Sequence, residues 1–265
     1  MDKNFLLKEK LISGLKSKFM SKIYANIYPI CNLYKKNSKK SPLVTQIIYG
    51  QKFSTKKKTD KWLKIKILDD NYHGYIVRKK FPYYFKPTHK VFKLKSNVYK
   101  FPNNKKKIKE LPFGSRIKEI KSKSNFIQFK LGWIKKSDLK PAKFKQKNIF
   151  SKIEIFKNIK YKWGGKSYLG IDCSGLIQIF FNFNNKFFPR DTKDQVKFLK
   201  KSINFKNMKK NDIIFWKGHV ALALSKDKLI HAYGPLKKTV IMNIQKTIVR
   251  IERTANLKVI SIKRI

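Results

Sequence analysis

The stretch Tyr161-Lys-Trp-Gly-Gly-Lys-Ser-Tyr-Leu-Gly-Ile-Asp-Cys-Ser-Gly-Leu176 is the most informative part of this sequence. It places Cys173 after a glycine-rich loop and at the start of an apolar run to Phe183, which predicts a buried helix. The first turn of a helix favours a thiolate through its dipole and its unpaired amides. His219 and His231 follow later in the chain, and a cysteine nucleophile needs such a base. The pattern therefore favours a hydrolase with Cys173 as its nucleophile.

Two other interpretations of Cys173 were weighed. A buried structural cysteine is common, but Asp172 and Ser174 would then need polar partners beside a core thiol. Zinc sites usually show close ligand pairs such as Cys-x-x-Cys, which this sequence lacks, so we expect no metal and no other cofactor. If the strands that begin at His219 and His231 pair as a hairpin, the second imidazole can fix the tautomer of the first.

The net charge of +50 is extreme and raises the hypothesis of nucleic-acid binding. The 65 basic residues are almost all lysines and lie in every segment, whereas specific nucleic-acid readers rely on arginine. We therefore attribute most of the charge to an A+T-rich coding bias and expect no obligatory nucleic acid. A basic nucleic-acid-binding protein stays as an alternative that would not need Cys173. The charge still favours acidic partners, including acidic peptides, and weak binding to anionic surfaces.

Cysteine usage and the N-terminus bear on the compartment. Cys31 and Cys173 lie far apart, and a nucleophile cannot be held in a disulfide, so a reducing compartment is the simpler expectation. The short apolar run 5–7 is interrupted by Lys8, which does not fit a signal peptide, and no segment reaches the roughly 20 apolar residues of a membrane span. We expect a cytoplasmic protein rather than a periplasmic or wall-associated one. Residues 4–24 carry a helical apolar stripe that could brace the protein or lie on an anionic membrane surface.

The composition predicts a helical or flexible segment at 1–26, two small all-β units at 27–80 and 88–142, and an α+β domain at 148–265. The expected strands are 43–48, 62–68 and 72–77 in the first unit, 90–94, 116–121, 126–130 and 132–134 in the second, and 212–216, 219–225, 229–233, 240–243 and 259–264 in the last domain. The expected helices of that domain are 149–157, 173–183, 193–201 and 249–255.

The two all-β units share a pattern of glycine and aromatic residues at corresponding positions. Gly74-Tyr-Ile-Val77 in the first matches Gly132-Trp-Ile-Lys135 in the second, and the segments 49–53 and 112–116 also correspond. A glycine followed by an aromatic and a β-branched residue near the end of such a unit resembles the bacterial SH3-like domains. The duplicated pattern therefore predicts two small SH3-like barrels.

Three motifs of the last domain occur together: Gly-Ile-Asp-Cys173-Ser-Gly-Leu, Lys210-Asn-Asp-Ile-Ile-Phe-Trp-Lys-Gly-His-Val220 and Leu229-Ile-His-Ala232. In this order and spacing they resemble the NlpC-type cell-wall peptidases, a family of papain-like cysteine peptidases, over residues 148–265. The paired SH3-like units resemble those of the γ-D-glutamyl-L-diamino-acid endopeptidases, which trim murein peptides with a free N-terminal L-Ala. The resemblance implies a papain-like α+β domain behind two SH3-like barrels, with an acidic murein peptide as substrate. A secreted or wall-associated peptidoglycan hydrolase or amidase of the same family is the alternative.

The resemblance also implies roles for single residues. Cys173 would be the nucleophile, His219 the base and His231 the polar third member. Tyr161 matches a family tyrosine that helps to bind substrate near the oxyanion. Asp172 would pair with the free α-amine of the substrate.

The remaining expected contacts to the substrate come from both parts of the chain. Ser174 would bond near the amine, and Thr192 stands where relatives often have serine. Tyr72 or Tyr75 of the first barrel is expected to cap the amine subsite, because a barrel that closes one end of the cleft would explain why a dipeptide end is required.

Overall fold

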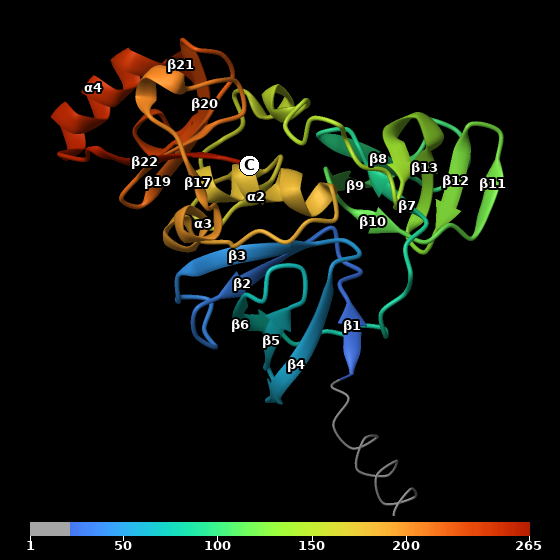
Figure 1. Ribbon diagram of the computed structural model, residues 1–265. Coiled ribbons are helices and arrows are strands. Elements are labelled where there is room, and N and C mark those ends of the chain that lie inside the picture. The colour runs from blue at the N-terminus through green and yellow to red at the C-terminus, as the bar shows by residue number, and fades with distance from the viewer. Residues whose placement is uncertain (1–21) are drawn as a thin grey trace, which may run out of the picture.

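The computed structural model describes residues 22–265, which fold into two small β-rich barrels and one α+β domain (Figure 1). Most of the stripe predicted as a helix over 4–24 lies outside the described residues. Its last residues, Ile23 and Tyr24, belong instead to strand β1 (Ile23–Ala25), which pairs with the first barrel. The first barrel therefore begins before residue 27.

The first barrel is a six-stranded antiparallel sheet with the order β1-β4-β5-β6-β2-β3. Its further strands are β2 (Ile30–Tyr34), β3 (Leu43–Ile48), β4 (Lys52–Lys58), β5 (Trp62–Ile67) and β6 (His73–Val77). In β5, Leu63, Ile65 and Ile67 are buried while the alternate residues, two of them lysines, are not, as a half-buried strand requires. The predicted strand 43–48 is confirmed.

The second barrel consists of two small sheets with the orders β10-β7-β14 and β11-β12-β13-β8-β9. Its elements are β7 (His89–Val91), β8 (Lys95–Tyr99), β9 (Lys107–Pro112), β10 (Arg116–Ile117), β11 (Lys121–Lys123), β12 (Phe126–Phe129), β13 (Gly132–Lys135), the 3₁₀ turn η1 (Lys136–Asp138) and β14 (Leu139–Pro141). The predicted strand 116–121 was too long, because β10 pairs with β7 over two residues only.

The α+β domain packs helix α2 (Cys173–Phe183) against a six-stranded antiparallel sheet with the order β17-β22-β18-β19-β20-β21. The sheet comprises β17 (Lys201–Ser202), β18 (Ile213–Trp216), β19 (His219–Ala223), β20 (Lys228–Tyr233), β21 (Lys238–Asn243) and β22 (Val259–Arg264). The other elements are η2 (Ile153–Phe156), β15 (Lys166–Ser167), β16 (Gly170–Ile171), α3 (Thr192–Phe198), η3 (Phe205–Asn207), η4 (Gly234–Leu236) and α4 (Ile244–Ala255).

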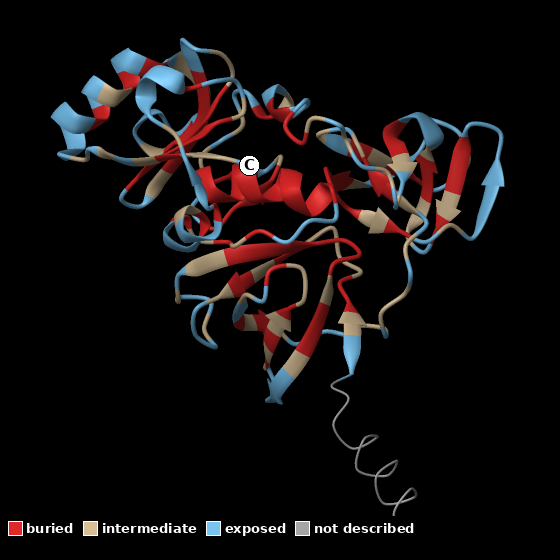
Figure 2. Ribbon diagram, in the orientation of Figure 1, coloured by how far each residue is buried: buried red, intermediate tan, exposed pale blue. Residues whose placement is uncertain are grey.

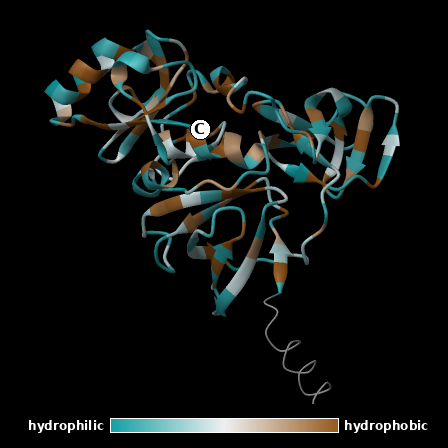
Figure 3. Cartoon of the chain, in the orientation of Figure 1, coloured by the Kyte–Doolittle hydropathy of each residue, from teal (hydrophilic) through white to brown (hydrophobic). Residues whose placement is uncertain are grey.

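Every residue of α2 is buried, so the helix lies at the centre of the molecule between the sheet and the first barrel (Figures 1 and 2). The second barrel reaches the same helix through Phe113, whose ring stacks on Phe183 with the ring centroids 4.6 Å apart. Helix α4, in contrast, covers the outside of the sheet and alternates hydrophobic and hydrophilic residues (Figure 3). Within residues 22–265, no helix is both long and apolar enough to cross a bilayer.

The helix predicted over 149–157 is wrong. The segment makes successive 3₁₀-type turns, with Ile153 N–H donating to the carbonyl of Phe150 and Lys157 N–H to that of Glu154. The apolar spacing correctly identified the buried side of the segment, since Phe150, Ile153 and Phe156 are all buried. A segment this short gains too little from helical propagation to fix the backbone as an α-helix.

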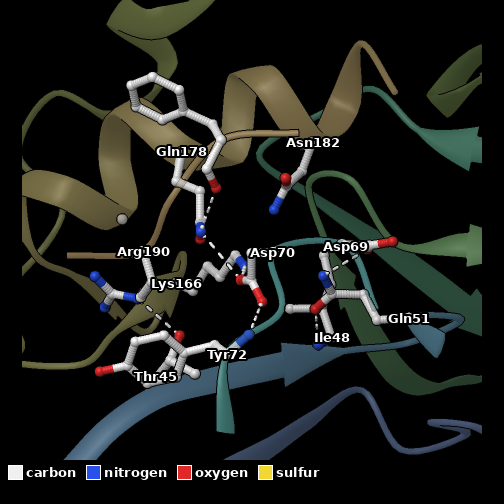
Figure 4. A network of polar contacts seen from close by, with 12 residues as sticks. Thr45, Ile48, Gln51, Asp69, Asp70, Tyr72, Lys166, Gln178, Asn182 and Arg190 are labelled. Carbon is white, nitrogen blue, oxygen red and sulfur yellow. Dashed lines mark hydrogen bonds and ion pairs between the residues drawn. The ribbon is translucent and has the colours of Figure 1, made fainter. Parts of the chain in front are cut away.

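A buried polar network joins the first barrel to helix α2 (Figure 4). Gln178 on the helix donates to Asp70 at 3.0 Å, and the same carboxylate accepts from the backbone N–H of Tyr72 at 3.0 Å. The ammonium of Lys166, fully buried, lies 3.7 Å from Asp70. The loop that carries Tyr72 is therefore held in place by the helix that begins at Cys173.

Candidate active site

Helix α2 begins at Cys173 because Asp172 caps it. The backbone of Asp172 is extended, and its Oδ1 accepts from the N–H of Gly175 at 2.7 Å. Gly175 is required here, since a Cβ at this position would come within 2.7 Å of the carbonyl oxygen of Gly165. The glycine-rich loop thus packs directly against the first turn that presents the nucleophile.

The thiol of Cys173 lies against the start of β19. Burial raises its pKa to about 12 and the nearby Asp172 adds to this, while backbone amides of Val220 and Ser174 act in the opposite direction. The helix position is therefore the predicted one, but burial outweighs the effect of the helix dipole on the thiol. In the free enzyme the nucleophile is a neutral thiol, and its proton leaves only when a base takes it.

His219 and His231 lie side by side, as the predicted hairpin requires. His219 Nε2 and His231 Nδ1 are 2.9 Å apart, and β19 pairs with β20. Burial lowers the pKa of His219 to about 4 and that of His231 to about 2, so both rings are neutral at pH 7.

The tautomers follow from these contacts. A base must present a lone pair, so if Nδ1 of His219 accepts the thiol proton, its own proton sits on Nε2 and is donated to Nδ1 of His231. His231 then carries its proton on Nε2, which lies 3.4 Å from the sulfur of Met242. The ring of Tyr233 stacks on His231 with the centroids 4.6 Å apart and holds it flat. The contact with His231 thereby fixes the orientation of the His219 ring.

A cavity of about 270 Å³ opens beside Cys173. The first barrel supplies one wall of it and the α+β domain supplies the rest. The lining residues are Val44, Tyr72, Tyr161, Trp163, Asp172, Cys173, Ser174, Arg190, Asp191, Thr192, Lys193 and Gly218. Gly218, which directly precedes His219 in the chain, is one of these lining residues.

The role of Asp172 in binding the substrate amine stays a prediction, and in this structure its carboxylate already accepts hydrogen bonds from other groups of the protein. Oδ2 accepts from Gly164 N–H at 2.8 Å and from Arg190 Nη2 at 2.6 Å, and Oδ1 caps the helix. Arg190 also donates to Ser174 at 2.7 Å and to Thr45 of the first barrel at 2.8 Å. Asp172 and Arg190 therefore form a buried pair that fixes the nucleophile's turn.

Asp191 lines the cavity, and its carboxylate can accept further hydrogen bonds. The hydroxyl of Tyr72 donates to it, at 3.0 Å from Oδ2 and 3.2 Å from Oδ1. Burial raises the pKa of Asp191, against the lowering effect of the Tyr72 hydrogen bond and of Arg190. Asp191 could not be singled out from the sequence, because its partner Tyr72 is 119 positions away and the only local signal is an acid directly before Thr192.

The other expected contact residues divide into two groups. Tyr161, Ser174 and Thr192 line the cavity, and burial raises the pKa of Tyr161, to which the nearby carboxylate of Asp172 adds. Tyr75 does not line it, since its ring lies 5.8 Å beneath the ammonium of Lys64 on another part of the barrel. Of the two tyrosines expected at the amine subsite, Tyr72 lines the cavity and Tyr75 does not.

The comparisons with known proteins agree on the type of domain. Residues 158–255 match the NlpC/P60 family, and residues 33–80 match the bacterial dipeptidyl-peptidase Sh3 domain. The α+β domain is an NlpC/P60 domain. Members of this family are cysteine peptidases, and the predicted nucleophile Cys173 and the predicted base His219 both lie within the matched residues.

Individual relatives place the NlpC/P60 domain in context. The chain is 44% identical to dipeptidyl-peptidase 6 of Lysinibacillus sphaericus over 72 residues, which span 27% of this chain and 27% of that protein. It is 26% identical to the γ-D-glutamyl-L-lysine dipeptidyl-peptidase of Bacillus subtilis over 230 residues, 77% of each chain.

A solved structure supports the architecture. An NlpC/P60 family protein from Bacillus cereus superposes with a TM-score of 0.76 at 17% identity, over 91% of this chain and 99% of that one. The likeness shows that the arrangement of the SH3-like barrels ahead of the NlpC/P60 domain is shared. Among residues 22–265, no group of three or more histidine, cysteine and acidic side chains is arranged to hold a metal ion.

Proposed function

We propose that this NlpC/P60 peptidase hydrolyses the γ-D-glutamyl–diamino acid bond of murein peptides that carry a free N-terminal L-Ala. The observation that carries the proposal is the contact between Tyr72 and Asp191 at the wall of the catalytic cavity. It puts a carboxylate with open acceptor sites where the first barrel lines the cavity, at a position suited to a protonated amine. Relatives named γ-D-glutamyl-L-lysine dipeptidyl-peptidase support the same substrate class.

The residues support an acyl transfer with two steps. The Sγ atom of Cys173 attacks the γ-carbonyl carbon of D-Glu while His219 takes the thiol proton, and the C–N bond breaks as His219 protonates the departing amine. Water then hydrolyses the thioester with His219 as its base and restores the thiol. We propose that the backbone N–H of Cys173, together with Tyr161, stabilises the oxyanion, because both lie at the helix start beside the cavity.

Substrate length follows from the position of the barrel. Val44 and Tyr72 of the first barrel line the cavity, and the loop carrying Tyr72 is pinned by Asp70 and Gln178. A rigid wall there leaves room for a dipeptide end rather than for a longer chain. A free L-Ala amine arises only after another hydrolase has cut the amide bond that joined it to the glycan, so the enzyme would act downstream of an amidase, on released peptides. A reducing compartment suits this role, because Cys173 must stay a free thiol.

The test is to incubate the enzyme with L-Ala-γ-D-Glu-L-Lys and identify the products by mass spectrometry. The proposal predicts free lysine and the dipeptide L-Ala-D-Glu. Cys173→Ala should be inactive, whereas Cys31→Ala serves as the matched control, because Cys31 is buried in the core of the first barrel and lines no part of the cavity. Release of alanine alone, or cleavage that survives Cys173→Ala, would contradict the proposal.

A further inference from the structure

The catalytic cavity holds four charged side chains, and two of them are already used. Asp172 and Arg190 neutralise each other at 2.6 Å and are almost fully buried. The remaining two are Asp191 and Lys193, which lie two positions apart where helix α3 begins. The cavity therefore offers a ligand one negative and one positive group at neighbouring points of its wall.

Lys193 is available for a ligand. Its side chain is exposed, and within residues 22–265 no carboxylate oxygen lies within salt-bridge distance of its ammonium. The acids nearest along the chain are Asp191, which Tyr72 engages, and Asp194, which lies outside the cavity lining. Arg190 cannot take the same part, because its nitrogens bond to Asp172, Ser174 and Thr45.

The substrate of the proposed function carries the complementary pair of charges. In L-Ala-γ-D-Glu the α-amine of alanine and the α-carboxylate of glutamate stand on either side of one peptide unit. The γ-linkage leaves that α-carboxylate free, and it carries no charge if it is amidated to isoglutamine. Asp191 and Lys193 both line the cavity, so a ligand whose amine binds Asp191 can bring its carboxylate to Lys193.

We propose that Lys193 binds the free α-carboxylate of the γ-linked D-Glu, so that the site selects acidic stem peptides over their amidated forms. The inference rests on the proposed function and adds a second charge requirement to the amine requirement. Lys193 acts on substrate choice rather than on the chemical step. Its loss should therefore lower kcat/KM for the acidic substrate by a larger factor than for the amidated one.

The experiment compares L-Ala-γ-D-Glu-L-Lys with L-Ala-γ-D-isoglutaminyl-L-Lys, using kcat/KM as the readout. A hydrogen bond between charged groups at an exposed site is worth roughly tenfold in kcat/KM. The wild-type enzyme should prefer the acid by about tenfold. Lys193→Met should lose most of this preference, because its kcat/KM for the acidic peptide falls. Lys197→Met is the matched control, because Lys197 lies on the same helix, is exposed and does not line the cavity.

The outcomes separate the two proposals. Equal cleavage of the acid and the amide by the wild-type enzyme, or a preference that survives Lys193→Met, would overturn the role of Lys193 while leaving the proposed function intact. Failure to cleave either tripeptide would overturn the proposed function and this inference with it. An unfolding midpoint of Lys193→Met in urea equal to that of the wild type shows that the variant is folded. A rate that falls equally on both substrates would instead make Lys193 a general structural residue and contradict the proposal.

Discussion

Replacing Arg190 by alanine should destabilise the protein far more than the loss of a surface ion pair. Its guanidinium is 1% exposed and makes three hydrogen bonds, to Asp172, Ser174 and Thr45. The change leaves the carboxylate of Asp172, 8% exposed, without its cation at the cap of helix α2. It also cuts the link between this cap and the first barrel.

The magnitude follows from the burial of the pair. Breaking a buried ion pair by removing one partner costs about 3–5 kcal/mol, because an uncompensated charge remains inside the protein. Thr45→Val is the matched control, since it removes only the bond from Arg190 Nε to the fully buried Thr45 hydroxyl and should cost about 1 kcal/mol. The free energy of unfolding is measured by urea titration at pH 7 for the wild type and both variants.

Catalysis should fall together with stability in Arg190→Ala, because the cap that positions Cys173 loses its support. A loss below about 1 kcal/mol, equal to that of Thr45→Val, would refute the reasoning that the Asp172–Arg190 pair is buried and essential to the cap.

Three further outcomes are expected. His231→Ala should lower kcat about 100-fold, because His219 loses the acceptor that orients it; His231→Asn should recover part of this rate in the same assay, and equal rates for the two variants would contradict the orienting role. The pKa of His219 is lowered to about 4 by burial, so the base stays neutral on acidification, and kcat/KM for the N-acetylated peptide, which does not need an ionised Asp191, should hold from pH 7 to about pH 5 and fall only near pH 4; a half-maximal rate near pH 6.5 would show an exposed base instead. Gly164→Ala should cost about 2 kcal/mol in urea unfolding, since the residue has φ +70° and a Cβ would come within 2.7 Å of the carbonyl of Leu43; an unchanged midpoint would exclude this close approach.

Much of the α+β domain could be predicted from its sequence. The apolar run that follows Asp172 predicts helix α2, because the capping acid and the continuous run of buried residues indicate the same first residue of the helix. The strand pattern of β18 to β20 was equally clear, since their residues are buried on both faces and form nearly continuous apolar runs.

The barrels were harder to predict because their many lysines obscure the alternation of apolar and polar residues along the strands. Strand β4 (Lys52–Lys58) has only two apolar or small buried positions before three exposed lysines, and β9 (Lys107–Pro112) begins with three exposed residues. Neither shows the period of two on which strand prediction depends. The pairing that makes them strands comes from neighbours that the local pattern does not reveal.

The residues of the site could be grouped where they stand in recognisable motifs, as Cys173, His219 and His231 do. The contacts of Arg190 with Thr45 and of Tyr72 with Asp191 could not be predicted, because they join different domains across more than 100 positions. The sequence therefore pointed to Asp172, the acid beside Cys173, for the amine, whereas our proposal gives this role to Asp191.

The most direct test of the account is the ratio of kcat/KM for L-Ala-γ-D-Glu-L-Lys to that for its N-acetylated form, measured in the wild type and in Asp191→Asn. The wild type should favour the free amine by about 10- to 100-fold, the value of a charged hydrogen bond, and the variant should lose that preference while keeping its rate on the acetylated peptide. A preference that persists in Asp191→Asn, or a wild-type enzyme that cleaves both peptides equally, would contradict the account.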